Sequence, residues 1–167
     1  DVRINGTNRF LLEPLVEARM LQYALKGRFQ SVLVLGAASL PSVEMVASFA
    51  RNVVVVEPEK RFTDAAQHLL RRHNVTVIET SLKEGYARQA PYDCIFVTGA
   101  MAQIPSVIAS QLAVGGCMLA VLRPSAMGAG RIVATLRLSE DEFETISLAD
   151  ASTPYLAGFA PENGFQF

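Results

Sequence analysis

Residues 31–42 read SVLVLGAASLPS, and this stretch decides how the rest of the chain is interpreted. A short, unbroken apolar run is followed by a turn at Gly36 and by Pro41. Such runs suit strands buried on both faces, and proline is well tolerated in the first turn of a helix. The stretch therefore predicts a strand, a phosphate-type loop and a helix start, although most glycines of such loops are absent.

Similar apolar runs recur along the chain. Strands are expected at 31–35, 52–57, 74–79, 93–98 and 117–122, and helices at 13–27, 42–50, 59–73 and 104–113. Alternating strands and helices favour an α/β layered fold with a parallel sheet and right-handed crossovers. The segments 131–138 and 143–149 alternate polar and apolar residues, which predicts an antiparallel hairpin at a sheet edge.

Length and charge limit the classes of function. The 167 residues contain no internal repeat or linker, so we expect a single domain over 1–167. Its parts would be an N-terminal segment and helix (1–28), a nucleotide-binding core (29–138), and a terminal strand and tail (139–167). A net charge of -1 offers no surface for nucleic acid, and the basic cluster at 71–73 is interpreted as a solvated helix end. No apolar run approaches the roughly 18 residues that cross a membrane.

The cysteines and histidines give no sign of a metal site. Cys94 and Cys117 each lie inside an apolar, strand-like run, which predicts buried thiols rather than a disulfide. Free thiols are typical of a reducing compartment, so a cytoplasmic location is expected. His68 and His73 have no partners at metal-ligand spacing, and no metal is expected.

The loop after the first buried strand is the expected ligand site, because open α/β sheets bind ligands beyond the carboxyl ends of their strands. Gly36 has the position of the tight-turn glycine. Glu57 follows 21 positions later, the spacing of a carboxylate that accepts both ribose hydroxyls of an adenosine. Glu57 could instead supply negative charge to the first turn of the helix starting near Pro58.

Two further strand ends contribute candidates with open alternatives. Ser81 could hydrogen-bond an adenine edge, or cap the turn that follows it. Thr98, Gly99 and Ala100 are small, which leaves room either for a ligand or for close packing of the next helix.

The run APYDCIFVTGAMAQIPSVIASQLAVGGCMLAVL (90–122) resembles the corresponding block of protein-L-isoaspartate O-methyltransferases. In that family a YDxIxVT strand is followed by IP, a QL helix and a strand that starts with GG. EPLVEARMLQYAL resembles the helix before their first strand, and NVVVVEPEKR and NVTVIE fall in register with the next two strands. The resemblance, which extends to about residue 138, implies a three-layer, Rossmann-like class I methyltransferase fold. Such a fold has a mostly parallel seven-stranded sheet and a C-terminal antiparallel hairpin.

The resemblance also implies S-adenosylmethionine as cofactor and a set of residues that bind it. Gly36 would be the first glycine of the cofactor loop, Glu57 the ribose acid, and Ser81 the residue in place of an adenine-side Asp. The full implied set is Gly36, Ala37, Ala38, Glu57, Pro58, Ser81, Leu82, Thr98, Gly99 and Ala100, the last three near the methyl donor.

Several positions depart from the family. The loop pattern acid-x-Gly-x-Gly-x-Gly is altered at Val34, Ala38 and Leu40. Because a β-carbon obstructs the approach of the backbone and a lost carboxylate removes a polar anchor, cofactor binding is expected to be weakened or lost. Leu12 stands where the family has an active-site Ser or Thr, which argues against isoaspartate repair.

The sequence therefore predicts an S-adenosylmethionine-dependent methyltransferase with a protein or small-molecule acceptor. No catalytic residue is predicted, since methyl transfer mainly requires alignment and desolvation. The alternative is a non-catalytic relative that keeps the fold for partner binding or regulation. A nicotinamide-dependent oxidoreductase would also use Glu57, but the loop lacks G-x-G-x-x-G. The tail aromatics Tyr155, Phe159 and Phe165 either cover an acceptor pocket or dock the tail onto the body.

Overall fold

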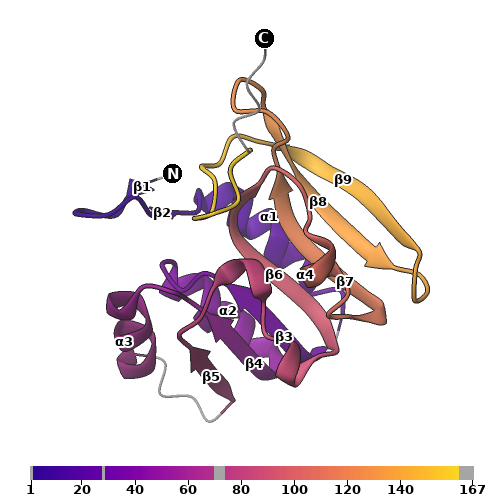
Figure 1. Cartoon of the computed structure of the whole chain (residues 1–167), viewed down its shortest axis with the longest axis horizontal. Coiled ribbons are helices and arrows are strands. Elements are labelled where there is room, and N and C mark those ends of the chain that lie inside the picture. The colour runs from indigo at the N-terminus through magenta and orange to yellow at the C-terminus, as the bar shows by residue number, and fades with distance from the viewer. Residues whose placement is uncertain (1, 28, 70–73, 162–167) are drawn as a thin grey trace.

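The computed structural model describes residues 2–27, 29–69 and 74–161 (Figure 1). The predicted basic cluster at 71–73, which includes His73, and also Phe165 lie outside these residues. The helices are α1 (Pro14–Ala24), α2 (Leu40–Phe49), α3 (Lys60–Leu69) and α4 (Ser106–Ala109), with the short 3-10 helices η1 (Leu82–Glu84) and η2 (Ala87–Gln89). The strands are β1 (Val2–Arg3), β2 (Phe10–Leu11), β3 (Phe29–Leu35), β4 (Ala50–Val56), β5 (Val75–Ile78), β6 (Tyr92–Met101), β7 (Leu112–Leu122), β8 (Gly130–Arg137) and β9 (Phe143–Ala151).

Seven strands form one sheet in the order β5-β4-β3-β6-β7-β8-β9. The first five in this order are parallel, and β8 and β9 are antiparallel at one edge. The predicted α/β fold, with a mostly parallel seven-stranded sheet and a terminal antiparallel hairpin, is thereby confirmed. A feature that was not predicted is the small separate sheet in which β1 pairs with β2.

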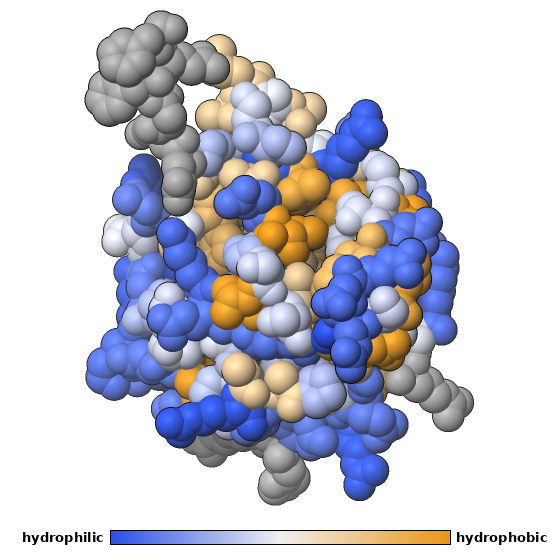
Figure 2. All heavy atoms as spheres, turned by 45° about the vertical axis from the view of Figure 1, so that its right-hand side comes forward, coloured by the Kyte–Doolittle hydropathy of each residue, from blue (hydrophilic) through white to orange (hydrophobic). Residues whose placement is uncertain are grey.

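The sheet lies between two layers of unequal build. Successive side chains of a strand point to opposite faces, so the apolar runs supply both layers. One face packs against α1, α2 and α3 through residues such as Met20 and Phe62. The other face is covered by shorter elements, namely η1, α4 and the C-terminal tail, through Leu82, Ile108 and Phe159. Figure 2 shows one side of the molecule, where hydrophobic side chains gather in a hollow bordered by hydrophilic ones.

The helix expected at 104–113 is wrong in length, because only Ser106–Ala109 is helical. Leu112 already pairs with Tyr92, so β7 begins five residues before the predicted strand at 117. The Gln111 side chain anchors this corner: its amide nitrogen donates to the Glu84 carbonyl at 2.7 Å and its oxygen accepts from the Tyr86 N–H at 2.9 Å. Sheet pairing and these bonds replace the last helical turn that the sequence pattern suggested.

Cys94 and Cys117 lie opposite each other on β6 and β7, and both are buried and free, which confirms their predicted burial. Hydrogen bonding with the Cys117 thiol, together with burial, raises the pKa of Cys94. Within the described ranges, no helix is long and apolar enough to cross a membrane. Nor does any cluster of His, Cys, Asp and Glu in that part of the chain suit a metal ion.

Candidate cofactor site

The loop between β3 and α2 is built on a glycine that the backbone requires. Gly36 has φ +97°, a conformation that residues with a side chain rarely adopt. A Cβ atom at Gly36 would lie 2.3 Å from Oγ1 of Thr98, whose hydroxyl donates to the Leu35 carbonyl at 2.9 Å. Gly36 and Thr98, which the sequence assigns to different strand ends, are therefore in direct contact.

Glu57 follows β4 and is fully buried at the carboxyl edge of the sheet. Its Oε2 accepts a hydrogen bond from the Ala37 N–H at 2.8 Å, which ties the carboxylate to the β3–α2 loop. Its Oε1 accepts from the Glu59 N–H at 3.1 Å, just before α3. The bond to Glu59 agrees with the interpretation of Glu57 as an acid at the helix start, and its role as the ribose acid stays a prediction.

The carboxylate of Glu57 is paired with an arginine from the N-terminal arm, a name we give to residues 2–12. Nη1 and Nη2 of Arg9 each lie 2.8 Å from a different oxygen of Glu57, a bidentate arrangement. Nη1 also lies 3.1 Å from Oε1 of Glu59, and the guanidinium carbon sits 5.4 Å from the centre of the Phe62 ring. The ion pair is buried, with 4% of the Arg9 side chain and 0% of the Glu57 side chain exposed.

The C-terminal strap, defined as Thr153–Pro161, crosses the same edge of the sheet. The Ala100 N–H donates to the Pro154 carbonyl and the Leu156 N–H donates to the Ala100 carbonyl, both at 2.9 Å. A Cβ atom at Gly99 would lie 3.0 Å from both the backbone nitrogen and the Cβ of Leu156. The small residues Gly99 and Ala100 therefore allow close packing, but of the strap rather than of the next helix.

Two aromatic residues of the strap are docked on the body. Phe159 is buried in the core layer beneath the strap, and its carbonyl accepts from the Ala102 N–H at 2.8 Å. Tyr155 donates its hydroxyl to the Arg123 carbonyl at 2.8 Å. The interpretation that these aromatics dock the tail is thus confirmed for the two that the structure describes.

The space around the loop tests whether the cofactor implied by the resemblance fits. The cavity enclosed by the arm, Ala38, Thr98, Gly99 and the strap measures about 10 Å³, the room of about one water molecule. Nη2 of Arg9 and Cδ1 of Leu156 lie 3.2 and 3.1 Å from a Cβ placed on Gly36. The ribose and methionine ends of the cofactor therefore do not fit the arrangement described, because the chain's own arm and strap fill that space.

The region assigned to adenine is different. We call Pro58, Ser81, Leu82 and Lys83 the adenine side, and Arg9, Gly36, Ala37 and Glu57 the ribose side. The adenine side borders a cavity of about 460 Å³, which Ala157 and Gly158 of the strap also line. Ser81 precedes η1 without a side-chain capping bond, so its hydroxyl does not cap that turn. This region has room for the adenine end of the cofactor, and its binding there stays a prediction.

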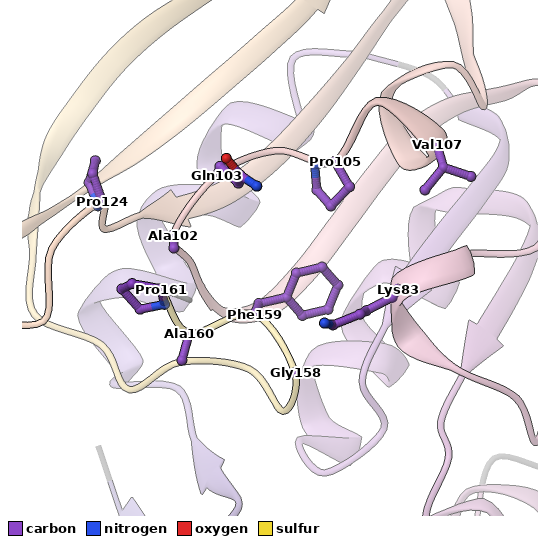
Figure 3. A pocket seen from close by; sticks show the side chains of 10 residues that line it. All are labelled: Lys83, Ala102, Gln103, Pro105, Val107, Pro124, Gly158, Phe159, Ala160 and Pro161. Carbon is purple, nitrogen blue, oxygen red and sulfur yellow. The ribbon is translucent and has the colours of Figure 1, made fainter. Parts of the chain in front are cut away.

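A second cavity, of about 580 Å³, adjoins the adenine side. Lys83 and Gly158 line both this cavity and the one of about 460 Å³. Figure 3 shows Lys83 and Phe159 facing each other, with Pro105 and Gln103 on the opposite wall. The wall is mostly proline, alanine and aromatic surface, with one ammonium and one amide group. Such a lining is typical of small-molecule sites, in which a few polar groups orient a mostly apolar ligand.

The positions that depart from the family pattern have structural roles. Val34 is fully buried in the core layer against α1 and α2, and Leu40 begins α2 and packs against that layer. Leu12 is also buried there. Ala38 borders the small cavity at the loop. That these residues weaken cofactor binding stays a prediction.

The pairing of Arg9 with Glu57 was missed from the sequence. The two residues are 48 positions apart, and a single arginine in a polar stretch carries no local signal of burial. Leu156 was missed as well, because a single leucine in an irregular tail carries no local signal of its contacts with Gly36 and Gly99. Both contacts depend on how the chain termini fold back over the sheet.

Comparisons with known proteins agree with this architecture. The sequence profile of the family described as Protein-L-isoaspartate(D-aspartate) O-methyltransferase matches residues 3–145. A protein-L-isoaspartate O-methyltransferase of Methanoculleus marisnigri is 33% identical over 122 residues, which cover 71% of this chain and 56% of the relative. One from Shewanella baltica is 30% identical over 145 residues, covering 84% and 69%. The chain spans about half the length of the first of these relatives.

Solved structures share the fold at low sequence identity. A protein-L-isoaspartate O-methyltransferase superimposes with a TM-score of 0.81 and 16% identity, covering 95% of this chain and 52% of that protein. The N-methyltransferase NodS of Bradyrhizobium japonicum, in complex with S-adenosyl-L-homocysteine, superimposes with a TM-score of 0.54 and 19% identity, covering 63% and 59%. At such identities the likeness concerns the fold alone.

Proposed function

The chain belongs to the protein-L-isoaspartate(D-aspartate) O-methyltransferase family, and from that premise we propose that it is an S-adenosylmethionine-dependent methyltransferase. The observation that carries the proposal is the position of Glu57. Its carboxylate is buried at the end of β4 and receives a hydrogen bond from the loop after β3. A carboxylate at that point is what recognition of a ribose requires in this class of fold.

The cavity on the adenine side supports the same proposal, because it borders Pro58, Ser81 and Leu82, which the family resemblance assigns to the cofactor. The protein would bind the cofactor along this edge once the ribose side is accessible. Family membership does not favour the non-catalytic alternative.

The acceptor that we propose to test first is a protein carboxylate, the class of group named in the family's description. Leu12 argues against isoaspartate as the acceptor. The residue is buried and carries no hydroxyl, so it cannot donate the hydrogen bond that the family resemblance assigns to a Ser or Thr. If an isoaspartate peptide is not methylated, the acceptors to test next are an ordinary side-chain carboxylate and a small-molecule acid.

The proposal is tested by binding first and by transfer second. Calorimetric titration with S-adenosylhomocysteine should give saturable binding to the purified chain, and Glu57→Ala should abolish it. Methyl transfer is then measured with methyl-labelled S-adenosylmethionine and paired peptides that contain either isoaspartate or aspartate at one position. Absence of binding at millimolar S-adenosylhomocysteine would overturn the proposal and favour the non-catalytic alternative.

A further inference from the structure

The ion pair between Arg9 and Glu57 differs from a surface salt bridge in its burial and in its partners. Both side chains are almost wholly removed from solvent, and the two contacts of 2.8 Å form a fork on the carboxylate. Exposed pairs are weak because water and salt screen them, whereas a buried pair cannot lose one member without leaving an unpaired charge. Arg9 is therefore strongly held at this position.

Among the described residues, four N–H donors reach the carboxylate of Glu57, two from the backbone and two from a side chain that can change its rotamer. The N–H groups of Ala37 and Glu59 belong to the backbone of the loop and of the start of α3. The other two donors are both nitrogens of the Arg9 guanidinium. A ribose that is to be bound by Glu57 needs acceptor capacity on the same oxygens, so it competes with Arg9 rather than adding to it.

The volume at the loop leads to the same conclusion. Nη2 of Arg9 lies 3.2 Å from a Cβ placed on Gly36, so the guanidinium packs directly against the glycine of the cofactor loop. The cavity left beside it holds about 10 Å³. The guanidinium thus takes both the hydrogen-bonding capacity and the space that a ribose would need.

Arg9 comes from an arm that packs on the core through Ile4 and Leu12 and carries its own local hydrogen bonds. Figure 1 shows the β1–β2 arm projecting away from the body of the molecule. Its own bonds are local: the Ile4 N–H donates to the Arg9 carbonyl at 2.9 Å, and the Arg9 N–H donates to Oγ1 of Thr7 at 3.0 Å. The arm can therefore keep its two-stranded form while Arg9 leaves Glu57.

We infer that Arg9 determines the cofactor affinity of this protein, as an internal competitor that occupies the ribose position of Glu57. The cofactor binds when the arm moves and the guanidinium leaves the carboxylate. This inference rests on the proposed function, since it concerns the same site. It attributes the expected weak binding to a residue outside the altered loop, and it makes the position of the arm control access of the cofactor to Glu57.

The expected size of the effect follows from a two-state equilibrium of the arm. When a ligand binds only the open state, the apparent dissociation constant equals the intrinsic one divided by the open fraction. A buried bidentate pair keeps that fraction small. Removing the guanidinium should therefore increase apparent affinity by about tenfold or more.

Affinity for S-adenosylhomocysteine is measured by calorimetry for the unmodified chain, Arg9→Gln and the matched control Arg19→Gln. Arg19 lies on α1 and is exposed. We expect Arg9→Gln to bind at least about tenfold more tightly than the other two, which should be equal. Equal affinity for all three proteins would overturn the inference and leave the proposed function standing. Weaker binding by Arg9→Gln would overturn it as well, because Arg9 would then belong to the ligand site.

Failure of every protein to bind would overturn both this inference and the proposed function. Because Arg9→Gln leaves a buried charge unpaired, a second measurement uses the unmodified chain. Trypsin cuts after arginine only when that side chain can enter the protease, so cleavage after Arg9 reports its release from Glu57. Addition of S-adenosylhomocysteine should accelerate this cut at least several-fold, while cleavage after Arg19 does not accelerate. Protection of Arg9 by a ligand that binds would contradict the inference.

Discussion

The carboxyl edge of the sheet has two halves that differ in what closes them. The ribose side is sealed by segments from the two chain termini, which bring Arg9 and Leu156 against Gly36. The adenine side is built from residues that immediately follow β4 and β5, and it opens to a cavity of about 460 Å³. One half therefore depends on long-range contacts between buried groups, and the other on local structure at strand ends. The two should respond differently to substitution.

The largest difference in the free energy of unfolding is expected between substitutions of two glutamates, Glu57 and Glu79. Glu57→Gln leaves the buried guanidinium of Arg9 without its countercharge, which should lower the free energy of unfolding by about 3–5 kcal/mol. Glu79→Gln is the matched control, since Glu79 lines the cavity beside the adenine side, is exposed, and accepts a bond from Thr63 at 3.2 Å. It should change stability by less than about 0.5 kcal/mol. Urea denaturation of both variants measures the difference.

A double variant sharpens this prediction. Arg9→Leu combined with Glu57→Gln removes both charges, so most of the loss seen with Glu57→Gln alone should be recovered. If Glu57→Gln and Glu79→Gln are equally mild, the ion pair is not what closes the ribose side.

A smaller difference is expected between two glycines with positive φ. Gly36→Ala combines backbone strain with a Cβ 2.3 Å from Oγ1 of Thr98, whereas Gly115, with φ +83°, has no atom within 4 Å of its Cβ position. Strain alone should cost about 1–2 kcal/mol at either position. Overpacking should add about 1–3 kcal/mol at Gly36. Thermal unfolding of the two variants isolates the packing contribution, and equal losses would show that the loop can relax away from Thr98.

The strap gives the third comparison. Leu156→Ala removes a buried side chain that covers Gly36 and Gly99, and should lower the free energy of unfolding by about 2 kcal/mol, the lower end of the range for core leucines. Leu15→Ala is the control, since Leu15 is 64% exposed on α1. Chemical denaturation of both tests this. A neutral Leu156→Ala would mean that the backbone bonds of the strap to Ala100, rather than its side chain, hold the edge closed.

What the sequence predicts correctly is local in character. The buried strands are visible as apolar runs because both faces of a parallel sheet are covered. The position of Glu57 beside the Gly36 loop is visible because the spacing between the two residues reflects one helix and one strand. The hairpin at the edge follows from period-two alternation. Each of these signals lies within one strand, one hairpin or one helix–strand unit.

What the sequence does not predict depends on contacts between distant segments. Arg9 gives no pattern around itself, and its role exists only because the arm folds back on β4 across 48 positions. The length of α4 is mispredicted for a related reason: Leu112 continues an apolar helical period, but it pairs with Tyr92 as the first residue of β7. Tertiary contacts decide both cases, and local propensity cannot anticipate them.

The smallest effect is expected at Lys83 on the adenine side. Its side chain is exposed, and within the described residues its ammonium group makes no hydrogen bond or ion pair. Lys83→Gln should therefore change the free energy of unfolding by less than about 0.5 kcal/mol, measured by urea denaturation beside Glu57→Gln. A loss above about 1 kcal/mol would mean that Lys83 supports the fold as Arg9 does. Arg9, a buried cation, and Lys83, an exposed one, would then not differ in how they contribute to the two halves of the edge.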